Sequence, residues 1–160
     1  MFLSVFDIFK IGIGPSSSHT VGPMKAATAF VTSLEQAGPV GSIEVTLHGS
    51  LAWTGKGHGT DSAVVLGLMG LQPETIDPDA VDGILRTVHE GKRLKAPGLD
   101  EIDFDPATHI RFDYDEELPR HTNGMRFVAR DGGGAVQRLP VLRAQFELDR
   151  LALLRPVLLE

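Results

Sequence analysis

The sequence predicts a two-layer α+β fold, in which helices pack on one mixed and largely antiparallel sheet. Three observations predict it. Residues 20 to 37 carry apolar side chains at helical spacing, residues 42 to 48 alternate between apolar and polar side chains, and a run of strand-like segments follows two further helical segments. With 160 residues and 17.2 kDa, the chain is expected to form a single domain over residues 1–160.

The first helix and the first strand are predicted from local patterns. Within residues 20 to 37, Thr20 is the expected N-cap and the Gly38-Pro39 pair is the expected stop. In residues 42 to 48 the apolar side chains share one face, which predicts a strand covered on one side. His48 falls on the polar face of this strand and is expected to have a structural role.

Two more helices are predicted from residues 60 to 91. Residues 60 to 69 begin with Thr-Asp-Ser and continue almost entirely apolar, which predicts a helix buried on most sides. The next helix is expected to begin at Asp77, because aspartate caps free amides and Pro78 fits a first turn, and to end at Gly91. Polar residues 92 to 105 are predicted to be a linker.

The last third of the chain is predicted to form strands. Apolar residues alternate over residues 110 to 114 and 125 to 129, with His109 on a polar strand face. A glycine-rich turn at residues 131–134 is expected to lead into a strand around residues 136 to 146. The place of residues 137–160 in the domain is left open, because this tail fits no pattern that we recognise.

Composition excludes several classes of function. Lys plus Arg number 15 against 21 Asp plus Glu, and the basic residues are scattered, which argues against nucleic acid or a membrane as a partner. The chain has no cysteine, which excludes disulfides, thiolate metal ligands and a cysteine nucleophile within it. Asp7 and Lys10 interrupt the apolar N-terminus, so a secretory signal is not indicated and a cytoplasmic location is expected.

The first of two glycine-rich segments covers residues 12–24. Ser16, Ser17 and Ser18 stand directly before the predicted helix, where free amides and the helix dipole favour a carboxylate or a phosphate. The alternative is that these serines only cap the helix. His19 favours a functional reading, because a loop seldom needs an imidazole for structure.

The second segment covers residues 49–61 and links the first strand to the buried helix. Three alternating glycines surround Lys56 and His58, so the backbone can approach a ligand closely. Trp53 is expected to be a packing anchor, and Asp61 is either a cap or a first-turn acid. A metal site made of His19, His58 and Asp61 lacks a short ligand pair and is not favoured.

Three ordered motifs resemble one known family. They are Ser-Val-Phe-Asp at residues 4–7 followed by GIGPSSSHTVGPMKAA, then LHGSLAWTGKGHGTDSAVVLGLMG, then LPRHTNGMRF, in which Thr122 stands where the family usually has proline. Together they resemble the beta domain of bacterial iron-sulfur L-serine dehydratases over roughly residues 4 to 134. That domain is similar in fold to the regulatory intervening domain of some D-3-phosphoglycerate dehydrogenases. From Gln137 onward the chain departs from the family pattern.

The resemblance implies an enzyme that converts L-serine to pyruvate and ammonia. Its 4Fe-4S cluster is held by the cysteines of a separate alpha domain, so the implied partners are that domain, L-serine and a second copy in a homodimer. No metal ligand is expected in this chain. Pyridoxal phosphate is not expected either, because enclosing it takes a two-domain chain.

The resemblance also assigns roles to residues. His58 would be the base, ahead of Lys56, whose ordinary pKa is too high. His19 would bind or orient the substrate, and Ser16, Ser17 and Ser18 would hold its carboxylate. Further substrate contacts would come from Thr20, Thr60, Asp61 and Asn123. The alternative function is a regulatory module that binds an amino acid or an anion without catalytic groups.

Overall fold

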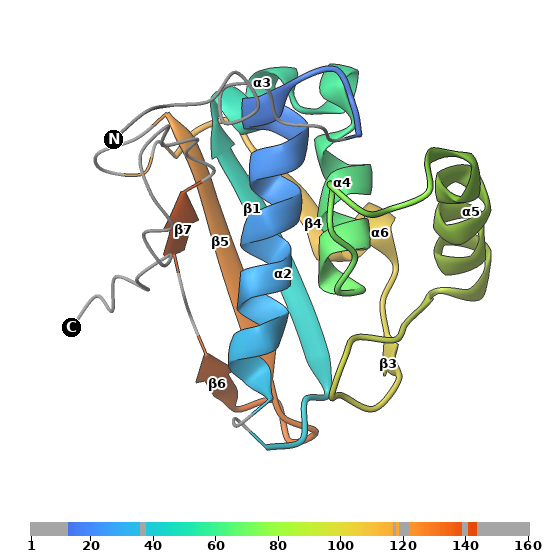
Figure 1. Cartoon of the computed structure of the whole chain (residues 1–160). Helices are drawn as coiled ribbons and strands as arrows, with labels where there is room; N and C mark the ends of the chain where they lie inside the picture. The colour runs from blue at the N-terminus through green and yellow to red at the C-terminus, as the bar shows by residue number, and fades with distance from the viewer. Residues whose placement is uncertain (1–12, 36–37, 117, 119–121, 139–140, 144–160) are drawn as a thin grey trace, which may run out of the picture.

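The computed structural model describes residues 13–35, 38–116, 118, 122–138 and 141–143 (Figure 1). Helical segments come first, interrupted by one long strand. They are a π-helical turn at Ser17–Val21, α2 (Gly22–Leu34), β1 (Ser42–Gly49), α3 (Ser50–Thr54), a 3-10 turn at Lys56–His58, α4 (Thr60–Leu68), a 3-10 turn at Pro78–Ala80 and α5 (Val81–Gly91). Short strands follow, with one helical turn among them. They are β2 (Arg93–Leu94), β3 (Ile102–Asp103), α6 (Pro106–His109), β4 (Ile110–Asp113), β5 (Asn123–Arg130), β6 (Val136–Arg138) and β7 (Val141–Arg143).

The main sheet is mixed and largely antiparallel, as predicted. Its strands run in the order β4-β1-β5, and both β6 and β7 pair with the far edge of β5. β1 is parallel to β4, with Val45 opposite Ile110, and antiparallel to β5, with Val45 opposite Phe127. Because β1 and β4 are parallel, both strands end at the same edge of the sheet, where α3 begins (Figure 1).

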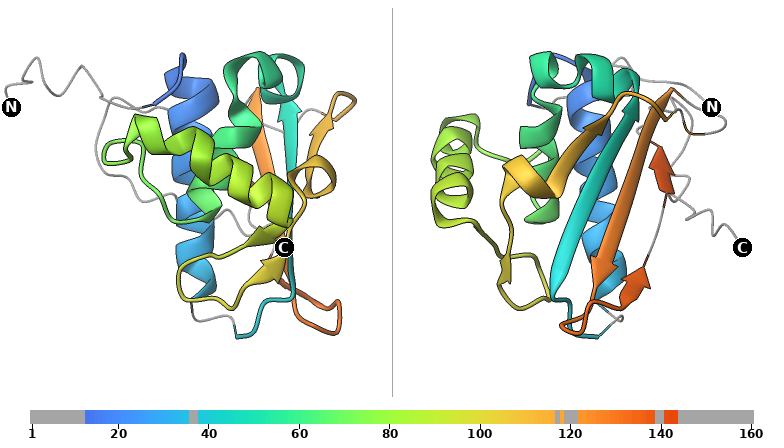
Figure 2. Two further views of the ribbon diagram at one scale, coloured as in Figure 1. Left: turned by 90° about the vertical axis from the view of Figure 1, so that its right-hand side faces the viewer. Right: turned by 180° about the vertical axis from the view of Figure 1, so that it is seen from behind.

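Helices α2 and α4 cover one face of this sheet, and α5 lies further out beside α4 (Figures 1 and 2). Phe30 of α2 stacks on Phe127 of β5 with ring centroids 4.9 Å apart, which joins the two layers. α2 and α4 approach each other closely at Gly67, where an added Cβ would lie 2.2 Å from the carbonyl oxygen of Met24. The two-layer prediction is therefore confirmed.

Several local predictions are also confirmed. β1 matches the bounds of the predicted strand, and α4 is buried along most of its length. The one-sided cover predicted for β1 is wrong for its second half, because Thr46 and His48 on the other face are also buried. Asp77 caps the 3-10 turn that leads into α5, since its carboxylate accepts a hydrogen bond from the Asp79 amide at 3.0 Å. The described part of the chain contains no helix long and apolar enough to cross a membrane.

Other local predictions are wrong. The helical segment begins at Ser17 with Ser16 as its cap, so Thr20 is not the N-cap. Residues 92 to 105 contain the β2–β3 ladder rather than only a linker. His109 ends α6 instead of lying on a strand. Two short strands, β6 and β7, replace the single strand predicted around residues 136 to 146. The last residues of that predicted strand lie outside the described ones.

The exposure of two side chains is the opposite of the predicted one. Trp53 was predicted to pack inside but is 68% exposed, because its neighbours Leu51 and Ala52 turn inward and anchor α3. His48 was predicted to lie on a polar face and is completely buried.

Candidate active site

His19 and His58 lie together at the edge of the sheet where β1 meets α3. His19 comes from the π-helical turn before α2, and His58 ends the 3-10 turn before α4. The centroids of their rings are 4.9 Å apart, and both side chains are half-buried. Single-turn π-helical insertions are rare and occur often at functional sites. The two glycine-rich segments of the sequence thus form one site.

The ring of His19 is held from both sides. Its Nδ1 lies 2.9 Å from the Ser18 hydroxyl, and its Nε2 lies 2.8 Å from the Thr54 hydroxyl and 3.2 Å from that of Ser50. The Thr54 hydroxyl donates its single proton to the Ser50 carbonyl at 2.8 Å, so it accepts from Nε2–H of His19. Ser18 then donates to Nδ1, and the hydrogen bonds fix one neutral tautomer.

The electrostatic surroundings favour this neutral form. Burial lowers the pKa of His19 below its ordinary value of 6.5, and the nearby charge of His58 lowers it further, while a hydrogen bond with the backbone of Ser50 acts in the opposite direction. His19 is therefore suited to orient a ligand as a neutral ring.

His58 carries its proton on a different nitrogen from His19. Its Nδ1 lies 2.9 Å from the carbonyl oxygen of Thr54, which can only accept, so Nδ1 carries the proton. The lone pair of the neutral ring is then on Nε2. Such an imidazole can accept a proton from a molecule bound beside it.

Two buried threonines connect the histidine segments crosswise. The Thr20 hydroxyl donates to the carbonyl oxygen of His58 at 3.1 Å, and the Thr60 hydroxyl donates to that of His19 at 2.6 Å. Thr20 is 5% exposed and Thr60 is fully buried. Because both hydroxyls are engaged by the backbone, the structure gives these two residues a positioning role; the substrate contact predicted for them stays a prediction.

The three serines differ in their surroundings. Ser16 caps the helical segment, and its hydroxyl lies 3.4 Å from the His19 amide and 3.4 Å from the Ser18 hydroxyl. Ser18 serves His19. Ser17 is exposed, and its hydroxyl makes no hydrogen bond within the part of the chain that the structure describes. Of the three, Ser17 is the one whose hydroxyl can bind a ligand without losing an internal contact.

The other two predicted substrate contacts lie in the same region. Asp61 is a first-turn acid of α4, and its carboxylate accepts from the Ser62 amide at 2.9 Å. Asn123 begins β5 opposite Gly49. Gly49 has φ +57°, and an added Cβ there would lie 2.3 Å from the Thr122 carbonyl oxygen, so glycine allows the third motif to approach the site closely.

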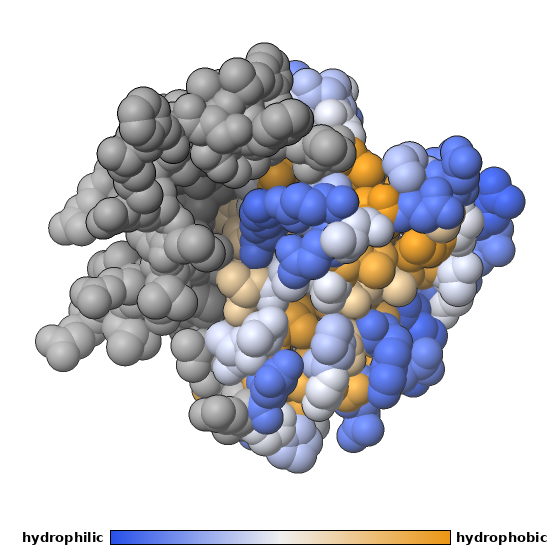
Figure 3. Space-filling view, viewed as in Figure 1, coloured by the Kyte–Doolittle hydropathy of each residue, from blue (hydrophilic) through white to orange (hydrophobic). Residues whose placement is uncertain are grey.

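A groove of about 660 Å³ leads away from His58 between α4 and α5. Figure 3 shows apolar side chains gathered in this hollow. The groove is bordered at one end by Gly14, Thr20 and His58, and its walls are mostly apolar: Ile13, Pro15, Ala63, Leu66, Val81 and Leu85.

The serine dehydratase beta-chain family model matches residues 4–139. The chain belongs to this family. It is 48% identical over 138 residues to L-serine dehydratase 1 of Escherichia coli, which covers 84% of this chain and 30% of that protein. It is 47% identical over 142 residues to an L-serine dehydratase of Streptomyces coelicolor, and 47% over 141 residues to one of Mycobacterium tuberculosis. These matches cover 84% and 85% of this chain and 30% of each relative.

The chain therefore spans about 30% of the length of the curated relatives that it matches. The family match includes both glycine-rich segments and the Asn123 motif. The match thus supports the family resemblance seen in the sequence.

Sequence reasoning missed the residues that support the histidines. Ser50 and Thr54 were not singled out, although both hydroxyls contact His19. The available signal was their spacing, since residues four apart share one face of a helix. That signal is weak because α3 is only five residues long.

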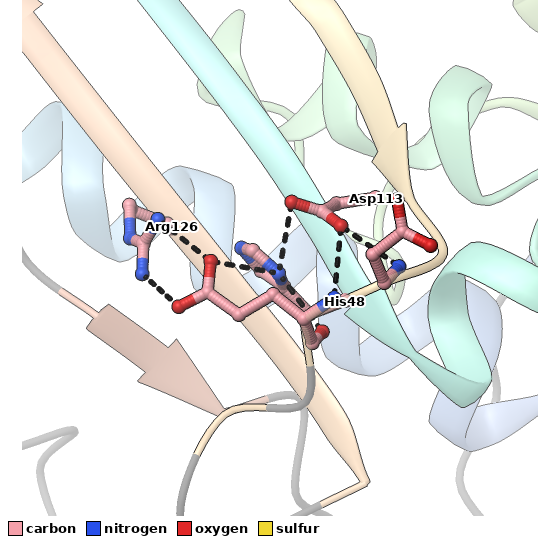
Figure 4. A network of polar contacts seen from close by, with 5 residues as sticks. His48, Asp113 and Arg126 are labelled. Atoms are coloured by element: carbon pink, nitrogen blue, oxygen red, sulfur yellow. Dashed lines mark hydrogen bonds and ion pairs between the residues drawn. The ribbon is translucent and has the colours of Figure 1, made fainter.

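A second polar cluster surrounds His48 on the sheet face away from α2 (Figure 4). The Nδ1 atom of His48 lies 3.3 Å from the Glu116 carbonyl oxygen, and 3.9 and 3.8 Å from the carboxylates of Asp113 and Glu116. Arg126 binds Glu116 through two nitrogens, at 3.2 and 2.9 Å. His48, Asp113 and Glu116 form the one group among the described residues whose spacing would suit a metal ion.

The contacts within this cluster do not favour a metal ion. Two backbone amides, of Asp115 and Glu116, donate to one oxygen of Asp113, and these bonds lower the pKa of its carboxyl group. The hydrogen bond with Arg126 lowers the pKa of Glu116. Because the carboxylates already have cationic or amide partners, the cluster fits a structural link between the end of β4, Arg126 of β5 and His48 of β1.

Proposed function

We propose that this chain supplies the proton-accepting and substrate-orienting part of an L-serine dehydratase, which converts L-serine to pyruvate and ammonia. One observation carries the proposal: the Thr54 carbonyl fixes the proton of His58 on Nδ1, and no residue that the structure describes bonds its Nε2. The ring borders a groove, and its centroid lies 4.9 Å from that of the His19 ring. Family membership and the printed names of the relatives support it.

The reaction needs a base of this kind. Dehydration breaks the Cα–H and Cβ–O bonds of serine, forms a Cα–Cβ double bond and releases water; the resulting enamine hydrolyses to pyruvate and ammonia. Nε2 of His58 would take the α proton. A neutral imidazole with an unshared pair on one nitrogen is a common general base in enzymes.

Other residues of the site would hold the substrate. The neutral ring of His19, fixed by Ser18 and Thr54, would orient it. The Ser17 hydroxyl stands in the first turn of the helical segment, where the dipole favours a carboxylate. Asp61 and Asn123 lie near enough in the fold to be further candidates.

The residues of this chain do not fit an iron-sulfur cluster, because the chain has no cysteine. We therefore assign the 4Fe-4S cluster to a cysteine-bearing alpha domain, which would account for much of the remaining length of the relatives. The cluster would supply the Lewis acid for the leaving hydroxyl.

The test is anaerobic isolation of the tagged full chain from its own cells. The proposal predicts a complex that contains a cysteine-bearing polypeptide and iron, and that releases pyruvate from L-serine until exposed to oxygen. The purified chain alone should show neither iron absorbance nor turnover. Iron and turnover in the chain alone would contradict the proposal. A complex that binds L-serine without producing pyruvate would favour the regulatory alternative.

A further inference from the structure

An exposed aromatic pair lies next to the histidine site. Trp53 is 68% exposed and Tyr114 is 46% exposed, and their rings meet edge to face with centroids 4.9 Å apart. Beside them, the Lys56 ammonium lies 5.4 Å from the centre of the Phe112 ring. We call the surface formed by Trp53, Lys56, Phe112 and Tyr114 the aromatic patch.

The patch is held rigidly by the fold. Trp53 belongs to α3, which is anchored in the core by Leu51 and Ala52, and Tyr114 follows directly after β4. β1 runs into α3, and β4 is parallel to β1, so both aromatic residues are held at the same edge of the sheet. Figure 2 shows α3 and the end of β4 at this edge. Rigid aromatic side chains lose little entropy on binding and dominate many protein interfaces.

The patch is continuous with the proposed active site. Thr54 follows Trp53 in the chain, and it contacts His19 through its hydroxyl and His58 through its carbonyl group. A protein that covered Trp53 would therefore lie against the residues that hold both histidines.

We infer that the aromatic patch is the docking surface for the cysteine-bearing part of the dehydratase. This inference rests on the proposed function. It follows from the position of the patch beside the site, from the absence of thiolate ligands in this chain, and from the fact that relatives are more than three times as long as the matched region. Docking there would bring the cluster close to a substrate held at His58 and would exclude water from that substrate.

The experiment measures the affinity of the full chain for the cysteine-bearing polypeptide that restores serine turnover to it. Trp53→Ala and Tyr114→Ala should each weaken binding, the tryptophan change by about 30-fold. Val136→Ala is the matched control, because Val136 is also a large exposed apolar side chain, at 44%, and lies on β6 away from this edge. It should bind like the unchanged chain.

A second measurement reports on the patch directly. Trp53 is the single tryptophan of the chain, so 5-fluorotryptophan gives one ¹⁹F signal from this chain, and that signal should shift when the unlabelled partner binds. Wild-type affinity of Trp53→Ala together with normal turnover would overturn the docking surface and leave the proposed function intact. A change in self-association without the partner would show instead that a second copy covers the patch. If no cysteine-bearing polypeptide binds, both proposals are wrong.

Discussion

Replacing Thr60 with valine tests whether the crosswise threonine contacts hold the site together. Thr60 is fully buried, and its hydroxyl donates to the His19 carbonyl oxygen at 2.6 Å. Valine has nearly the same shape but no donor, so the change removes one buried hydrogen bond and places a methyl group against a carbonyl oxygen. Losing a buried hydrogen-bond partner costs about 1–3 kcal/mol, or roughly a 5- to 150-fold change in the unfolding equilibrium.

The assay is urea unfolding, monitored both by far-UV circular dichroism and by Trp53 fluorescence. The two signals should give the same midpoint. Thr87→Val is the matched control. The Thr87 hydroxyl also donates to a backbone carbonyl, that of Gly83 at 3.0 Å, but it is exposed on α5. This control should change the free energy of unfolding by less than about 0.5 kcal/mol. Equal small losses in both variants would refute the reasoning, because the buried bond would then contribute no more than a solvated one.

Two further predictions concern the same site. NMR titration of the full chain should give His19 a pKa below 6.5, and His58→Gln should raise it by removing the repulsive charge; an unchanged value would show that the rings do not interact electrostatically. Because the unfolded chain binds this proton more readily, the His19 contribution to stability is complete above pH 6.5 and is lost as pH falls toward the lowered pKa. In the assembled enzyme, Ser17→Ala should raise KM for L-serine without loss of stability, whereas Ser16→Ala should cost about 0.5–2 kcal/mol as a lost cap. The reverse pattern in urea unfolding and turnover assays would contradict the assignment of Ser17 to the substrate.

The fold could be predicted where local patterns determine structure. Alternation over β1 gave its inward face, and Asp77 with Pro78 gave the start of the 3-10 turn that leads into α5, because strand periodicity and helix capping depend on adjacent residues. The pairing of β1 with both β4 and β5 could not be deduced in register, since it depends on residues more than sixty positions apart.

The exposure of individual side chains was less predictable. His48 contacts Asp113 and Glu116, which are distant in the sequence, and no local pattern shows these contacts or its burial. Trp53 was misplaced because hydrophobic character alone does not show which side of a five-residue helix meets the core.

The candidate site was predictable in part. The two glycine-rich segments drew attention to His19 and His58, and the structure brings their rings together. Which nitrogen of each ring carries the proton could not be deduced, because it depends on Ser18 and Thr54 as hydrogen-bond partners.

The central claim is that His58 accepts a proton from the substrate, and turnover of the assembled enzyme after His58→Ala tests it most directly. His89→Ala is the matched control, because His89 is an exposed histidine in the last turn of α5. The account predicts that His58→Ala lowers kcat for L-serine by roughly 10²- to 10⁴-fold while L-serine still binds, and that His89→Ala leaves kcat unchanged. Near-normal kcat in the His58 variant would contradict the claim and favour a regulatory role for this chain.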